Sequence, residues 1–150
     1  MYRRILVPID GSATAQRGLQ EALGLAKTCD ASLVLLHVVE AYPMMMEMAT
    51  ATTWEQVTND LRAHGQRVLE QAHQAALAAR IACEARLEDS AAARVCDVIV
   101  EQVRERRCDL VVMGTHGRRG MAHAVLGSDA ERVIRMSPVP VLLVRAPEPA

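Results

Sequence analysis

The residue types best suited to binding chemistry gather in one stretch, GTHGRRGMAHAVLGS, at positions 114–128. Four of the chain's eight glycines lie there, and a serine directly follows the last of them. Glycine costs backbone entropy, but it lets main-chain N–H groups approach an anion with no Cβ in the way. The stretch is therefore typical of a phosphate-binding loop. The alternative is a set of ordinary turn residues ahead of an ordinary helix cap.

Known phosphate motifs narrow this interpretation. A P-loop requires GxxxxGK[ST], and the sole lysine of the chain, Lys27, lies far from the glycines. A dinucleotide fingerprint requires GxGxxG after the first strand, which is neither the pattern nor the place found here. The pattern is G-x2-G-x9-G-S, running from Gly114 through Gly117 to Gly127 and Ser128. The last two residues open a predicted helix, whose free N–H groups and dipole favour negative charge.

Two hydrophobic periods alternate along the chain. Compact apolar runs predict strands at 3–9, 32–39, 82–88, 109–113 and 140–145, with the third nearer an edge. Helical spacing predicts four helices between these strands. The first is capped by Ser12, and the second runs from about Thr53 to Arg80, with Thr53 and Gln56 as a capping box. The third runs from a Ser90 cap to about Arg106, and the fourth is opened by a Ser128–Glu131 capping box and ends before Pro138. Residues 41–52 are predicted to form a loop, and 146–150 a tail.

Strands that alternate with helices indicate a single α/β domain with a parallel sheet covered on both faces. In such doubly wound sheets, ligands bind beyond the carboxyl ends of the strands, where the strand order reverses. For an order of 3-2-1-4-5, that point lies between Pro8-Ile9-Asp10 and Met113-Gly114. About fourteen residues separate Met113 from Ser128, whereas strand-to-helix loops usually take about 2–6. Length and glycine content both favour a binding loop.

Composition excludes several function classes. The net charge is −1 and only 2% of residues are aromatic, which argues against nucleic acid or an anionic membrane as the main partner. No apolar stretch approaches the roughly 20 residues that span a bilayer, and the N-terminus is typical of a strand rather than a signal peptide. Four cysteines without a CxxC pair indicate free thiols in a reducing compartment. We expect a cytoplasmic protein.

With its flanks, the glycine pattern resembles the nucleotide-binding branch of the universal stress protein family. RRILVPIDGS is similar to that family's opening strand with its acidic residue, and DLVVMGTHGRRG and LGSDAERVIRMSPVPVLLVR are similar to its second half. The resemblance extends over nearly the whole chain. It implies an open, doubly wound five-stranded sheet of order 3-2-1-4-5, Rossmann-like and similar to the adenine nucleotide alpha hydrolases. It also implies a homodimer through the last strand, Val141 to Arg145, and ATP between strands 1 and 4.

When the family's nucleotide-binding residues are matched to this chain by position, the resemblance implies specific contacts. The adenosine would be bordered by Pro8, Ile9 and Asp10, with Val38 offering main-chain groups to the adenine; Met113 and Gly114 would lie by the ribose and first phosphate, and Gly117, Arg118, Gly127 and Ser128 would hold the phosphates. Asp129 departs from the family, which often has a small apolar residue there. If its side chain points at the ligand, its charge would weaken ATP binding or call for a bridging divalent metal such as Mg²⁺. The alternative is that helix geometry aims the side chain away from the phosphates.

Two candidate residues each keep two interpretations. Asp10 could bind the ligand or simply form an Asp-Gly turn, and His116 could contact phosphate or face solvent. No nucleophile elbow or placed acid–base pair stands out, so catalysis beyond weak ATP hydrolysis is not expected. The three hypotheses are an ATP-binding regulatory dimer, a dimeric interaction protein of the same fold that has lost the nucleotide, and a weak ATPase.

Overall fold

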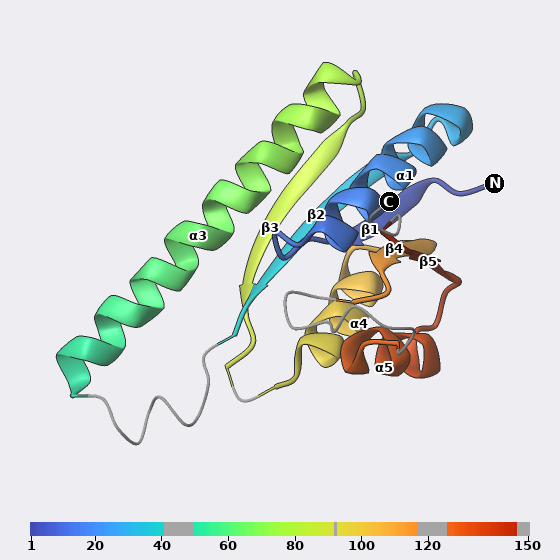
Figure 1. The fold of residues 1–150 in the computed structure, drawn as a ribbon. Coiled ribbons are helices and arrows are strands. Elements are labelled where there is room, and N and C mark those ends of the chain that lie inside the picture. Colours follow the sequence, from blue (N-terminus) through green and yellow to red (C-terminus); the bar gives the residue numbers. More distant parts are fainter. Residues whose placement is uncertain (41–49, 92, 117–125, 147–150) are drawn as a thin grey trace.

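The computed structural model describes residues 1–40, 50–91, 93–116 and 126–146. Strands and helices alternate along the chain (Figure 1): β1 (Arg4–Pro8), α1 (Ala13–Cys29), β2 (Ser32–Val39), α3 (Ala51–Ala78), β3 (Cys83–Asp89), α4 (Val95–Glu105), β4 (Leu110–Gly114), α5 (Ser128–Met136) and β5 (Val141–Val144). The strands form one parallel sheet of order β3-β2-β1-β4-β5. The predicted α/β fold and strand order are therefore confirmed.

Strand β1 lies at the centre of the sheet, between β2 and β4. Leu6 pairs with Val34 on one side and with Val111 on the other. The chain moves outward from β1 in one direction through β2 and β3, and then returns to the other side with β4. This is the reversal of strand order expected from the sequence, and it brings the carboxyl ends of β1 and β4 next to each other.

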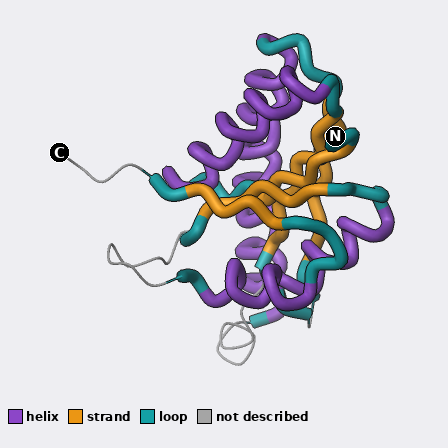
Figure 2. The backbone as a smooth tube through the Cα atoms, turned by 90° about the vertical axis from the view of Figure 1, so that its right-hand side faces the viewer, coloured by secondary structure: helices purple, strands orange, loops and turns teal. Residues whose placement is uncertain are grey.

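Helices cover both faces of the sheet (Figure 2). One apolar cluster joins α1 and α3 to the sheet and includes Ile5 and Val7; the other joins α4 and α5 to it and includes Leu6. Successive residues of β1 thus enter opposite cores, as the period of two in a strand requires. Burial on both faces explains why the strands are apolar runs rather than alternating ones.

A glycine contact brings α1 unusually close to β4. A Cβ added to Gly114 would lie 2.9 Å from both the carbonyl carbon and the Cβ of Thr14, and one added to Gly18 would lie 3.4 Å from the Gly114 nitrogen. Real Cβ atoms essentially never show distances under 3.0 Å, so Gly114 is what permits this approach, whereas the contact at Gly18 is an ordinary van der Waals one. As a result, the first turn of α1 lies directly over the carboxyl end of β4.

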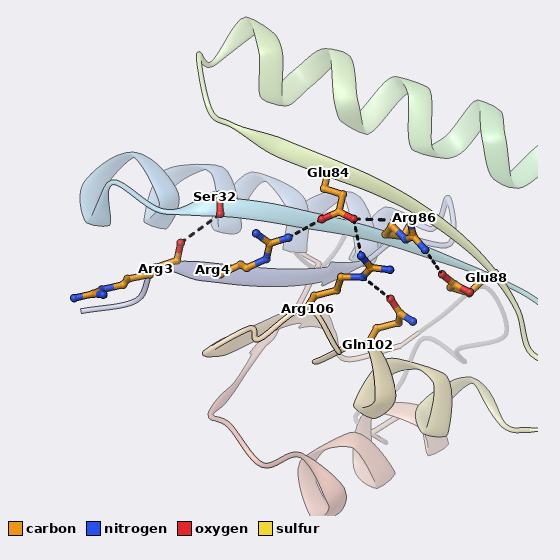
Figure 3. A network of polar contacts seen from close by, with 8 residues as sticks. All are labelled: Arg3, Arg4, Ser32, Glu84, Arg86, Glu88, Gln102 and Arg106. Atoms are coloured by element: carbon orange, nitrogen blue, oxygen red, sulfur yellow. Dashed lines mark hydrogen bonds and ion pairs between the residues drawn. The ribbon is translucent and has the colours of Figure 1, made fainter. Parts of the chain in front are cut away.

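Charged side chains occupy the face of β3 on the α4 side (Figure 3). The Glu84 carboxylate accepts hydrogen bonds from Arg4 at 2.6 Å and from Arg106 at 3.2 Å, and Arg86 pairs with Glu88 at 3.1 Å. These contacts join β1, β3 and the residue that follows α4. They explain the weak apolar alternation of this strand, which is an edge strand as predicted, because charged residues protect exposed sheet edges.

The predicted starts of α3 and α4 are wrong. Helix α3 is capped by Thr50, whose Oγ1 accepts the Thr53 N–H at 3.4 Å, rather than by a box of Thr53 and Gln56. Helix α4 begins at Val95, not after Ser90. The Ser90 N–H donates to the Val39 carbonyl at 3.0 Å, so this residue ends the sheet instead of opening the helix. The predicted Ser12 cap of α1 is confirmed, since its Oγ accepts the Ala15 N–H at 3.1 Å.

All four cysteines are free thiols, as expected, with Cys96 and Cys108 buried. The pKa of the Cys108 thiol is raised to about 11, mainly because the thiol is buried, while the nearby charge of Arg4 acts to lower it. Among the helices of the described ranges, none has the length and apolar character needed to cross a membrane.

Candidate functional site

The predicted site residues of the first half lie at the carboxyl ends of β1 and β2. Pro8 ends β1, and Ile9 continues the ladder by donating its N–H to the Leu36 carbonyl at 2.8 Å. The Ile9 carbonyl lies 2.7 Å from Nδ1 of His37, a buried residue on β2. Val38, the next residue, is half-buried and packs against the apolar cluster on the opposite face of the sheet. The carboxyl ends of β1 and β2 are thus joined by hydrogen bonds beyond the last residue of β1.

Asp10 lies in a tight turn after β1. Its Oδ1 accepts the Ser12 N–H at 2.9 Å, and Gly11 between them has a φ of +86°, a conformation that favours glycine. The Asp-Gly turn considered in the sequence analysis is therefore real. The same turn holds the half-buried Asp10 carboxylate at the carboxyl edge of the sheet.

The glycine-rich stretch begins where β4 ends. Met113 and Gly114 are the last, buried residues of β4, and Thr115 continues it by donating its N–H to the Val144 carbonyl at 3.0 Å. The Thr115 carbonyl accepts the Gly127 N–H at 2.8 Å. This bond joins the two ends of the stretch at its base. The predicted phosphate-binding residues Gly117 and Arg118 lie outside the described residues.

Gly127, Ser128 and Asp129 lie at the start of α5, but not as predicted. Gly127 is the N-cap, in an extended conformation, and its carbonyl accepts the Glu131 N–H at 2.9 Å. Ser128 is therefore the first residue inside the helix, and the predicted Ser128–Glu131 capping box is wrong. The reason is non-local, because the bond between Gly127 and Thr115 determines where the helix begins. Ser128 is exposed at this positive end of the helix dipole.

Asp129 is half-buried in the first turn of α5. Its negative charge is one of the influences that raise the pKa of the Cys96 thiol, after burial and Asp97. Cys96 belongs to the first turn of α4, so the negative charge of Asp129 acts on the start of this second helix. The departure from the family noted in the sequence therefore adds an acid to the first turn of α5.

Hydrogen bonds connect the β1–α1 turn to the glycine-rich stretch. The Thr14 hydroxyl donates to the His116 carbonyl, and its Oγ1 also lies 3.2 Å from the Ser12 Oγ. His116 is half-buried, and its Nδ1 lies 2.9 Å from the Thr115 hydroxyl. Sequence reasoning missed Ser12 and Thr14 as members of this site. The Ser-x-Thr spacing after the Asp-Gly turn was the available signal, although it is equally typical of a helix start.

Two surface hollows formed by described residues lie elsewhere. One of about 800 Å³, lined by Arg3, Lys27, Asp30 and Arg80 among others, lies at the amino ends of the strands. Another of about 590 Å³ lies between α3 and β3. Within the described ranges, no three His, Cys, Asp or Glu side chains gather to hold a metal ion. The candidate site is therefore assigned from strand ends, helix termini and hydrogen bonds.

The family model described as the universal stress protein family matches residues 1–145. Universal stress protein MJ0531 of Methanocaldococcus jannaschii is 31% identical over 148 residues, which cover 99% of this chain and 85% of that protein. The solved structure of the protein MJ0577 superposes with a TM-score of 0.85 at 23% identity, covering 99% of both chains. A universal stress protein in complex with cAMP superposes with a TM-score of 0.70 at 26% identity, over 97% of this chain and 98% of the other.

The fold and these similarities define the class of protein, which is an α/β domain with a doubly wound parallel sheet. The chain belongs to the universal stress protein family.

Proposed function

We propose that this protein binds ATP, or another adenine nucleotide, at the carboxyl edge of the sheet between β1 and β4. The observation that carries the proposal is the bond between Gly127 and Thr115, which joins the ends of a glycine-rich stretch beside the start of a helix. Main-chain N–H groups and a helix dipole together suit a polyphosphate. The cAMP complex of a similar universal stress protein supports an adenine nucleotide as the ligand.

In this proposal each part of the site has its own role. Pro8, Ile9 and Asp10 border the adenosine, and the main chain at Val38 faces the adenine. Met113 and Gly114 lie by the ribose and the first phosphate, while Gly117, Arg118, Gly127 and Ser128 hold the phosphates. A Mg²⁺ ion would be held mainly by phosphate oxygens and water, as is usual for this ion.

We further propose that the protein acts as a homodimer through its last strand. β5 is an edge strand, and Leu142 on it is 36% exposed. The carbonyls of Pro140 and Val144 accept bonds from β4. Because main-chain groups alternate in direction along a strand, those of Val141 and Leu143 face outward, where a second copy would pair. Sedimentation velocity should give the mass of two chains, and a monomer mass would contradict this part of the proposal.

The role that fits these features is a regulatory binding module rather than an enzyme. The Asp10 Oδ1 accepts the Ser12 N–H, and Nδ1 of His116 lies within hydrogen-bond distance of the Thr115 hydroxyl. Each of these two side chains therefore stabilises the local structure. Free thiols fit a reducing, cytoplasmic setting. Slow ATP hydrolysis would be incidental. Turnover above background that disappears on changing Asp10 or His116 would instead establish an enzyme.

Asp129 favours a second candidate function, a dimeric interaction protein of the same fold without a nucleotide. An acid in the first turn of α5 suits the helix dipole, but it adds negative charge where phosphates would lie. If the carboxylate repels them, Asp129→Asn should tighten ATP binding, because it removes the charge and keeps the shape. If it does not, the affinity stays unchanged.

The test begins with purified protein. After denaturation, chromatography of the supernatant should show an adenine nucleotide, and added ATP should raise the melting temperature of nucleotide-free protein. Gly117→Ala should lower the ATP affinity by crowding the main chain near the phosphates. Gly24→Ala is the matched control, since a Cβ at Gly24 meets nothing within 4 Å. No co-purified nucleotide and no shift with ATP would refute nucleotide binding.

A further inference from the structure

We propose that Thr14 is a positioning residue for the phosphate end of the site, acting through its hydrogen bond to the His116 carbonyl. This inference rests on the nucleotide-binding function proposed above. Thr14 is half-buried in the first turn of α1, and His116 comes directly before Gly117, the second glycine of the motif. The bond joins segments 102 positions apart in the sequence.

The direction of the hydrogen bonds follows from counting protons. The Ser12 Oγ accepts the Ala15 N–H at 3.1 Å, so its single proton is available for the Thr14 Oγ1 at 3.2 Å. The Thr14 proton then goes to the His116 carbonyl, which can only accept. The result is a chain of donors running from the helix N-terminus through two hydroxyls to the start of the glycine-rich stretch. Chains of this kind polarise and strengthen their members.

Close packing explains why Thr14 reaches this carbonyl. Gly114 lies directly beneath the Thr14 main chain, with no space for a Cβ between them. The second anchor of the stretch is the bond from the Gly127 N–H to the Thr115 carbonyl. The base of the stretch is thus held at adjacent residues from two sides, by α1 at His116 and by the start of α5 at Thr115. Loss of the Thr14 bond removes the contact that joins His116 directly to α1.

The bonds that hold the adenosine end of the site come from main-chain groups rather than from the Thr14 hydroxyl. Asp10 is held by the main-chain N–H of Ser12, and Ile9 by the main chain of β2. Removing the hydroxyl should therefore weaken contacts to the phosphates and leave those to the nucleoside. This difference separates a positioning role from general damage to the fold, which would weaken both ligands alike.

The experiment compares the dissociation constants of ATP and adenosine, measured by calorimetry well below the melting temperature. Thr14→Val keeps the shape and removes the donor, so its ATP dissociation constant should rise roughly 3- to 10-fold, as expected for one lost hydrogen bond. The adenosine constant should change by less than about 2-fold on the same grounds. Thr14→Ser should restore wild-type ATP affinity, and Thr14→Ala gives a second hydroxyl-free variant should the valine not fold.

Thr28→Val is the matched control, because Thr28 also lies on α1 and its hydroxyl bonds only the Gly24 carbonyl of the same helix, at 3.0 Å. Exchange of the Gly127 N–H with deuterium provides a readout without nucleotide, and it should be faster in Thr14→Val than in Thr28→Val. Equal ATP affinity in both valine variants would overturn the inference, as would an equal loss of ATP and adenosine. Failure of the wild-type protein to bind any adenine nucleotide would instead overturn the proposed function, and this inference with it.

Discussion

Gly114→Ala tests the close approach of α1 to β4, on which the geometry of the candidate site depends. The added Cβ would lie 2.9 Å from the carbonyl carbon and Cβ of Thr14 and 3.0 Å from its carbonyl oxygen. Two of these three atoms belong to helix backbone, which cannot rotate away as a side chain end would. Either α1 or β4 must therefore move by several tenths of an ångström.

The magnitude follows from two opposing terms. Overpacking a close-packed interior costs about 1–3 kcal/mol, whereas alanine restricts the unfolded chain and returns about 0.4–1 kcal/mol. We expect a net loss of about 1–2 kcal/mol, or a fall in melting temperature of roughly 3–8 °C for a domain of this size. The same shift would displace Thr14 from His116 and weaken ATP binding.

Thermal and urea unfolding of the apo protein would measure this loss. Gly24→Ala is the control, since its Cβ points into open space and alanine is the better helix former by about 1 kcal/mol. This variant should melt above the wild type. If Gly114→Ala melts at or above the wild type while Gly24→Ala behaves as expected, the contact between α1 and β4 does not constrain the fold as argued.

Two further predictions concern charge and ionisation. Glu84→Gln removes the negative charge shared by Arg4 and Arg106 and leaves one accepting oxygen in place of two, so it should cost about 1 kcal/mol in urea unfolding, less at high salt. Glu131→Gln, whose partner Arg135 is exposed on the same helix, should cost at most about 0.5 kcal/mol. Equal costs for the two variants would contradict the role given to the Glu84 network. Burial raises the pKa of the Cys108 thiol from its ordinary value of 9.0 to about 11 in the folded protein, so its stabilising contribution is complete below pH 9 and is lost as the pH rises toward 11. Cys108→Ala should flatten that decline in urea midpoints measured from pH 8 to 11, and an unchanged pH profile would show that the thiol ionises alike in both states.

Local patterns predicted the strands and helices well because buried positions, which are mostly apolar, recur along the sequence with the period of the helix or strand. β2 begins and ends at the predicted residues, 32 and 39, since both of its faces are covered and six of its eight residues are leucine or valine. The Ser12 cap was also predicted, because its acceptor and donor are three residues apart. The errors at Ser90 and Ser128 both involve a main-chain bond to a segment distant in sequence. The Ser90 N–H donates to the Val39 carbonyl, and the Gly127 N–H donates to the Thr115 carbonyl.

The candidate site divides in the same way. The glycine spacing and the reversal of strand order could be predicted, and they located the carboxyl ends of β1 and β4 as the place to look. Ser12 and Thr14 could not be recognised as part of it. Their types suit a helix start equally well, and the partner of Thr14 is the carbonyl of His116, which any residue type would offer at that position.

The amino-acid sequence alone was sufficient for the order of the strands and helices along the chain and for the buried face of each. These features depend on hydrophobic periodicity and on residue spacing within one segment. Tertiary packing determined which polar groups meet, Thr14 with His116 and Gly127 with Thr115. The physical reason is that a hydrogen bond between distant segments is lost when its two atoms move apart by a few tenths of an ångström, so it depends on how closely those segments pack. The contact of α1 with Gly114 provides such close packing beside the bond from Thr14 to His116.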